Sequence, residues 1–105
     1  MSEKSAWEIF SEECPRVSRS FQELSREANV HGALDEKTRL LVLVGIYSAT
    51  RDPGALRHFV AEAFRAGASK HEIEAASLLP FSVGVSSAEM SIPIILDVAK
   101  KMAKT

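Results

Sequence analysis

The sequence is poor in the features on which several classes of protein depend. It has a single cysteine, Cys14, so no disulfide can form within one chain. No segment approaches the about 18 apolar residues that a membrane-spanning helix needs. The first ten residues, MSEKSAWEIF, have no apolar core of a secretion signal. These absences predict a cytoplasmic protein without a membrane span.

Charge of one sign is also lacking. Thirteen Lys and Arg residues face 14 Asp and Glu residues, for a net charge of −1. This balance offers no electrostatic basis for binding nucleic acid or a membrane surface, and we expect neither partner. The three histidines and the scattered acids do not form a metal-ligand spacing. We therefore expect no metal and no cofactor.

What the chain has in quantity is apolar sequence in helical patterns. Hydrophobic residues make up 46% of its 105 residues, and this length predicts one domain over residues 1–105. A chain of this size leaves much of its surface exposed. Because nearly every expected helix is rich in apolar residues, we expect further burial through oligomerisation.

The centre of the chain predicts three successive helices. Asp35 is a candidate N-cap for a helix over 36–49, whose apolar centre 40–46 predicts burial on several sides. Asp52-Pro53 is a strong helix start, and the helix that it begins should end at Gly67. The sequence Ser69-Lys70-His71-Glu72 matches a capping box, which predicts a third helix to about Leu79. The second of these helices has an apolar stripe at spacings of three and four residues: Leu56, Phe59, Val60, Ala63 and Phe64.

Three further helices are expected at the two ends. The first covers about 5–13, and the second covers about 15–28, with Val17, Phe21 and Leu24 directed inward. The last begins near Ser86 or Ser87 and runs to about Lys101. Its expected inner stripe is Met90, Ile94, Val98 and Met102. Pro93 lies within this last pattern, so it should kink the helix or mark its true start.

Three segments resemble the carboxymuconolactone decarboxylase family, which includes the alkylhydroperoxidase D (AhpD)-like proteins. They are CPRVSRSFQEL, LDEKTRLLVLV and HFVAEAFRAGASKHEIEAA, and together they span most of the chain. The resemblance implies an all-α fold, an AhpD-like orthogonal bundle of about six helices. It also implies a homo-oligomer, a hexamer or trimer.

The reactive groups of the peroxidase branch of that family are missing here. The resemblance implies a Cys-x-x-Cys pair and a His on one helix, with a Glu on the preceding helix. Such a pair works because a thiolate attacks and a second thiol resolves the product as a disulfide. Counting back from the Gly that ends the helix places Phe59 at the His position and Asp52 and Ala55 at the cysteine positions. Leu40 stands at the Glu position.

A register slipped by one residue is the alternative. It would put His58 in the histidine role and Arg51 and Gly54 at the cysteine positions. The slip would turn the side chains of a continuous helix by about 100°, so we disfavour it. Neither register supplies a cysteine, so the composition excludes a dithiol cycle at this site.

Three hypotheses for function follow. The first is a family member without peroxidase chemistry, whose former site is apolar and is lined by Leu40, Ala55 and Phe59. Such a protein would bind a small apolar ligand or serve only as an assembly. Arg51 and Asp52 are further candidates for lining a pocket. The simpler interpretation is a turn residue and an N-cap, and the N-cap role by itself explains Asp52.

The second hypothesis is an acid–base enzyme, a decarboxylase or lactone-type enzyme acting on a small organic acid. His58 would be its base, Glu62 would orient the imidazole, and Arg51 or Arg57 would hold a carboxylate. The simpler interpretation is a surface histidine that pairs with Glu62. The third hypothesis is a peroxidase or thiol reductase that uses Cys14. The simpler interpretation there is a small residue at a helix end.

Overall fold

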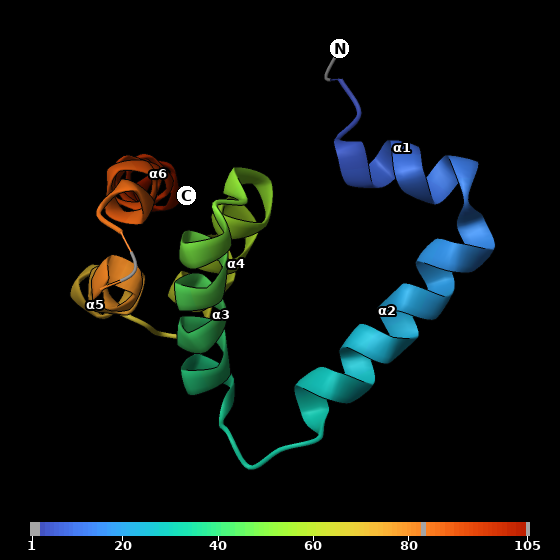
Figure 1. The fold of residues 1–105 in the computed structure, drawn as a ribbon, viewed down its shortest axis with the longest axis horizontal. Helices are drawn as coiled ribbons and strands as arrows, with labels where there is room; N and C mark the ends of the chain where they lie inside the picture. Colours follow the sequence, from blue (N-terminus) through green and yellow to red (C-terminus); the bar gives the residue numbers. More distant parts are fainter. Residues whose placement is uncertain (1–2, 83, 105) are drawn as a thin grey trace. The chain divides into compact units, whose positions relative to one another are not determined.

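A computed structural model describes residues 3–82 and 84–104, and within these ranges it contains α-helices, one short 3₁₀ turn and no strand (Figure 1). This confirms the prediction of an all-α fold. The chain divides into two compact units, Met1–Ala33 and Leu34–Thr105. The single domain expected from the length stays a prediction.

The first unit is a pair of helices, α1 (Ala6–Glu13) and α2 (Pro15–Val30). Ser5 caps α1 through a capping box with Glu8, and Pro15 occupies the first turn of α2. The two helices meet through aromatic side chains. The ring of Trp7 lies 5.6 Å from that of Phe10 and 5.9 Å from that of Phe21 between centroids. The helices predicted over 5–13 and 15–28 are thus present, the second two residues longer.

Within the first unit, the stripe on α2 that was predicted to face inward is not covered. Val17, Phe21 and Leu24 are 60%, 54% and 70% exposed. The helical spacing itself is correct, because these residues do share one face of α2. A two-helix unit has too little structure to cover that face, and the described aromatic contact of α2 involves Phe21 alone.

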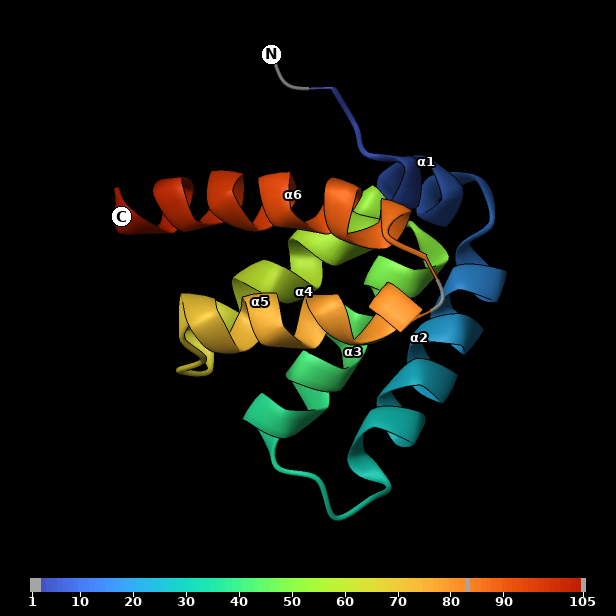
Figure 2. The ribbon, with the colours of Figure 1, turned by 60° about the vertical axis from the view of Figure 1, so that its left-hand side comes forward.

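The second unit consists of α3 (Glu36–Thr50), α4 (Pro53–Arg65), α5 (Lys70–Leu78), the 3₁₀ turn η1 (Leu79–Ser82) and α6 (Ser86–Ala103). Helices α5 and α6 lie side by side, and α3 and α4 cross them (Figure 2). All three predicted caps are present. The carboxylate of Asp35 accepts from the Thr38 amide at 2.7 Å, that of Asp52 accepts from the Ala55 amide at 3.1 Å, and Ser69 and Glu72 form the capping box.

The core of the second unit is mainly apolar and draws on all four α-helices, and three serines, Ser48, Ser77 and Ser91, are buried with it. The predicted stripe of α4 supplies Leu56, Val60 and Ala63, with Phe59 and Phe64 packed at its edge. The predicted stripe of α6 supplies Ile94 and Val98, again with Met90 and Met102 at the edge. Ile73 of α5 completes the centre. The expected inner faces of both helices are confirmed.

Helix α3 is buried on fewer sides than its apolar sequence predicts. Leu40 and Val44 are buried, but Val42 and Ile46, on another face, are 48% and 47% exposed. On the side toward α5, a Cβ at Gly45 would lie only 3.3 Å from the carbonyl oxygen of Ala76. The glycine therefore allows α3 to approach α5 closely, and the helix leaves a different apolar face uncovered.

Pro93 does not mark the start of the last helix, because α6 runs without a break from Ser86 to Ala103. Proline removes a backbone donor, but both Pro93 and Glu89, four residues before it, are exposed, so water can satisfy the freed carbonyl. Within the described ranges, no helix combines the length and the apolarity needed to cross a bilayer.

Candidate functional site

The turn between α3 and α4 carries two of the candidate residues, Arg51 and Asp52. Arg51 ends α3 in the left-handed conformation, at φ 59° and ψ 46°, which is uncommon for a residue with a side chain. Its guanidinium Nη1 donates to the backbone carbonyl of Ser86 at 3.0 Å, which ties the turn to the start of α6. Asp52 caps α4 through its side chain, and its amide donates to the carbonyl of Tyr47. Both residues thus have a structural role in this turn: Arg51 holds it to α6, and Asp52 caps α4.

The interior beside this turn is mainly apolar. Leu40, at the position where the resemblance implies an acid, is 4% exposed and belongs to the core. Val44 on the same helix and Leu56 and Val60 on α4 are completely buried. Among the described residues lining this part of the core, no carboxyl, imidazole or thiol is buried with them. The buried side chains between the two helices are hydrocarbon apart from the hydroxyl of Ser48, which donates to the carbonyl of Val44 at 2.7 Å.

An aromatic pair closes the edge of this core. The half-buried ring of Phe59 stacks on Tyr47, with 5.3 Å between centroids and 5° between planes. The His58 imidazole meets the same Phe59 ring edge-on at 4.9 Å. Phe59, at the position where the resemblance implies the histidine, is therefore a packing residue, and Ala55 lies half-buried one turn before it.

His58 is exposed, and the groups expected to assist it have other partners. Glu62 Oε2 accepts from Arg65 Nη1 at 2.6 Å, one turn along the same helix. Arg57 Nη1 donates to Asp97 Oδ2 of α6 at 2.6 Å. The side chains proposed to orient the imidazole and to hold a carboxylate are thus both engaged in ion pairs.

Asp97 is the most strongly paired acid near this site. Besides Arg57, it accepts from Lys101 Nζ at 3.1 Å on its own helix. The hydrogen bond from Arg57, followed by that from Lys101, lowers the pKa of the Asp97 carboxyl below its ordinary value. The group is half-exposed, so each pair contributes modestly to stability. The Arg57–Asp97 pair joins α4 to α6, and the lowered pKa keeps the Asp97 carboxyl ionised.

A second carboxylate joins α3 to α5. Glu72 accepts from the Ser69 amide at 2.9 Å and from Lys37 Nζ at 3.0 Å. The backbone hydrogen bond from Ser69, and then the hydrogen bond from Lys37, lower the pKa of the Glu72 carboxyl. The cap and the ion pair together account for the lowered pKa of Glu72, so no substrate-binding role is needed to explain it.

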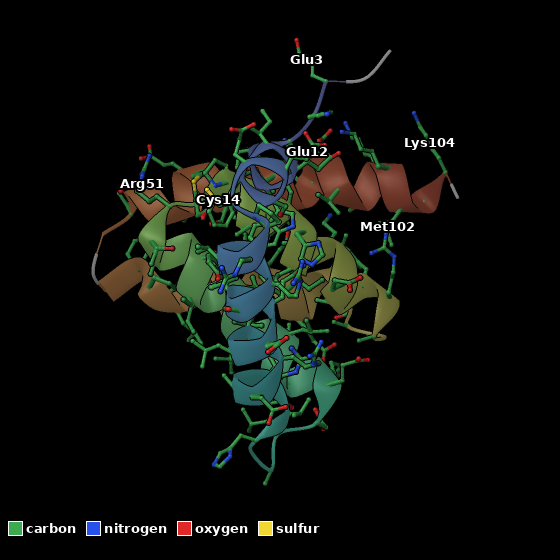
Figure 3. All side chains as sticks on the ribbon, turned by 90° about the vertical axis from the view of Figure 1, so that its right-hand side faces the viewer. Glu3, Glu12, Cys14, Arg51, Met102 and Lys104 are labelled. Atoms are coloured by element: carbon green, nitrogen blue, oxygen red, sulfur yellow. The ribbon has the colours of Figure 1, made fainter. Side chains whose placement is uncertain are left out.

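Cys14 lies at the junction of α1 and α2 and is exposed (Figure 3). Its amide donates to the carbonyl of Phe10 at 2.8 Å, and its carbonyl accepts from the amide of Ser18 at 3.0 Å. It thus ends one helix and begins the next. In the part of the chain that the structure describes, no three His, Cys, Asp or Glu side chains are grouped so that they could hold a metal ion.

Sequence reasoning missed the partners of the candidate residues. Tyr47 was not singled out, although it stands seven residues after Leu40, two turns along the same helix. Contacts such as Arg57–Asp97 and Arg51–Ser86 join positions 40 and 35 residues apart. Local sequence patterns do not predict such long-range pairs.

The fold and the site define an all-helical protein in which two core helices carry caps, ion pairs and hydrocarbon at the turn that joins them. Residues 15–92 match the carboxymuconolactone decarboxylase family, and the chain belongs to that family. Searches among curated proteins and among solved structures gave no significant match.

Proposed function

We propose that this protein is a non-redox member of its family, a helical homo-oligomer in which the α3–α4 pair serves packing and assembly. The burial of Leu40 carries the proposal. An acid at this position would have to lie in a core of Val44, Leu56 and Val60, where an unpaired charge is costly. The apolar residue instead stabilises the helix pair.

The other positions named by the resemblance support the same proposal. Asp52 caps α4, Ala55 follows it in the first turn, and Phe59 stacks on Tyr47. A capping partner accounts for Asp52 and a packing partner accounts for Phe59. A small apolar ligand of this site would contact the half-buried Tyr47–Phe59 pair, because Leu40 is buried in the core.

Acid–base catalysis by His58 is the weaker alternative. It needs an oriented imidazole and a cation free to hold an organic acid. Glu62 is paired with Arg65, Arg57 with Asp97, and Arg51 with the backbone of Ser86. The exposed His58 imidazole can be reached directly, but a substrate would have to displace the two ion pairs before Glu62 or Arg57 could assist it.

Peroxide turnover is the test of the non-redox proposal. Purified protein is mixed with hydrogen peroxide or an organic hydroperoxide and a dithiol reductant, and peroxide loss is followed beside a protein-free control. We expect no turnover above the control, and no difference between the wild type and Cys14→Ser. Turnover that disappears in Cys14→Ser would overturn the proposal in favour of a one-cysteine peroxidase.

A further inference from the structure

The beginning of α6 is held in place differently from the rest of the helix. We call residues 86–92 the α6 arm; it ends at Pro93, which has no amide hydrogen to donate to the carbonyl of Glu89. We propose that the α6 arm opens as a unit about Pro93 and that the side chain of Arg51 holds it closed. This inference goes beyond the proposed function, because it concerns a movement within the second unit and not the chemistry of the site.

Pro93 supplies the hinge. A proline inside a helix removes one hydrogen bond of the helical ladder, and its ring crowds the preceding turn, so helices bend at such residues. Pro93 and Glu89 are both exposed, so water can reach the carbonyl that lacks its helical donor. The bonding between the arm and the remainder of α6 is therefore weakened on the outer side of the helix, where bending leaves no polar group buried.

Packing against the core is strong beyond the hinge and weak before it. Beyond Pro93, α6 is anchored by three buried apolar side chains, Ile94, Ile95 and Val98. The ion pair between Asp97 and Arg57 lies in the same part of the helix. In the arm, Ser91 is the one buried side chain among those that the structure describes. Since burial of apolar surface is the main source of stability, the arm gains less from packing than the rest of α6.

The buried side chain of the arm is also unsatisfied. Ser91 is completely buried, and its hydroxyl has no hydrogen-bond partner in the described part of the chain. The buried serines Ser48 and Ser77, by contrast, each donate to a carbonyl about one turn back in their own helix. A buried hydroxyl without a partner costs free energy, and opening the arm would let water satisfy it. Ser91 therefore favours the open arm.

Arg51 supplies the contact that opposes this opening. Its Nη1 donates to the carbonyl of Ser86, the first residue of the arm, at 3.0 Å, and Figure 3 shows Arg51 beside the start of α6. Val85, at the N-cap of α6, provides no side-chain hydrogen bond to the helix. Arg51 keeps a left-handed backbone that arginine seldom adopts, and such a conformation persists where surrounding contacts hold it. The arm is thus hinged at Pro93 and tied at its other end by Arg51.

Hydrogen exchange of the full-length protein, followed by mass spectrometry, measures the opening. In a helix, the amides of 90–92 donate to carbonyls within the arm, and those of 97–100 donate to carbonyls from Pro93 onward. In the wild type, the amides of 90–92 should exchange at least about tenfold faster than those of 97–100, because they open without global unfolding. Equal rates in the two segments would overturn the hinge.

Arg51→Asn tests the role of Arg51, because asparagine tolerates the left-handed conformation and is too short to reach Ser86. Exchange at 90–92 should rise about fivefold or more, and exchange at 97–100 should stay as in the wild type. Arg57→Gln is the matched control: it removes a guanidinium that pairs with α6 beyond the hinge, so exchange at 90–92 should not change. No rise in Arg51→Asn, or an equal rise throughout the second unit, would contradict the proposal.

Two variants should slow the opening. Pro93→Ala restores the missing amide donor, and Ser91→Ala removes the unsatisfied hydroxyl. Each should slow exchange at 90–92 several-fold relative to the wild type. Unchanged exchange in Pro93→Ala would place the hinge elsewhere and refute the proposal, and unchanged exchange in Ser91→Ala would refute the part assigned to its hydroxyl. The peroxide assay is independent of these outcomes and tests the non-redox proposal separately.

Discussion

Replacing Leu40 by glutamate would restore the type of residue that the resemblance implies, and it tests whether the site is a closed core. Leu40 is 4% exposed and packs within the cluster that includes Val44, Leu56 and Val60. Removing a buried leucine costs about 2 kcal/mol of transfer free energy. The new carboxyl would be desolvated without a partner, which raises its pKa, and each pKa unit adds about 1.4 kcal/mol of destabilisation.

With a rise of about two units, the free energy of unfolding should fall by about 4 to 5 kcal/mol at pH 7, a large part of the stability of a small protein. The charge-dependent part of this loss is full above the raised folded-state pKa. It vanishes below the unfolded-state pKa of about 4.3, because both states then carry the proton. The difference between variant and wild type should therefore shrink to about 2 kcal/mol near pH 3.5.

Urea unfolding followed by circular dichroism at pH 7 and near pH 3.5 measures this difference. Val42→Glu, at a position 48% exposed on the same helix, is the control and should cost less than 1 kcal/mol. Leu40→Met should also cost little, since it conserves volume. A Leu40→Glu variant as stable as the wild type at pH 7 would refute the claim that Leu40 lies in a closed core. It would instead favour a polar site between α3 and α4.

Three further predictions concern the framework of the second unit. Gly67→Ala should lower the free energy of unfolding by about 1 kcal/mol in chemical denaturation, because φ is +96° there, while Gly32→Ala, in open space, should not. Asp52→Ala should cost about 1 kcal/mol through loss of the α4 cap, and Asp52→Asn should retain most of it; equal losses would argue against the cap. Glu72 and Asp97 have lowered pKa values, so their contribution is present above about pH 4.5 and is lost as the pH falls through the folded-state values. Melting temperatures between pH 6 and 3 should fall less in Asp97→Asn than in the wild type, and parallel curves would contradict this assignment.

The helices themselves could be predicted from the sequence because their signals are local. Asp35, Asp52 and Ser69 each accept from a backbone amide three residues ahead. Because the capping residue and this amide are close in sequence, a local pattern predicts the helix start. Gly67 ends α4 for an equally local reason, its positive φ. The missing dithiol could also be predicted, because a chain with one cysteine cannot supply two.

Which apolar residues are buried could not be predicted in the same way. The run 40–46 is apolar throughout, yet Val44 is in the core and Val42 is not, because neighbouring helices cover only some faces of α3. Periodicity on α2 correctly grouped the stripe but assigned it to an interior that the unit does not provide. Periodicity identifies a face, and only the packed neighbours decide whether it is covered.

In the candidate site, too, local features could be predicted from the sequence and contacts between helices could not. The sequence by itself determined the ends of the helices, the family and the absence of a second thiol, since each depends on residue types at short separation. Only the tertiary structure decided that Phe59 stacks on Tyr47, that Arg57 pairs with Asp97, and that Leu40 lies among hydrocarbon. These contacts arise where separate helices cross, and helix packing brings together residues that no sequence spacing connects.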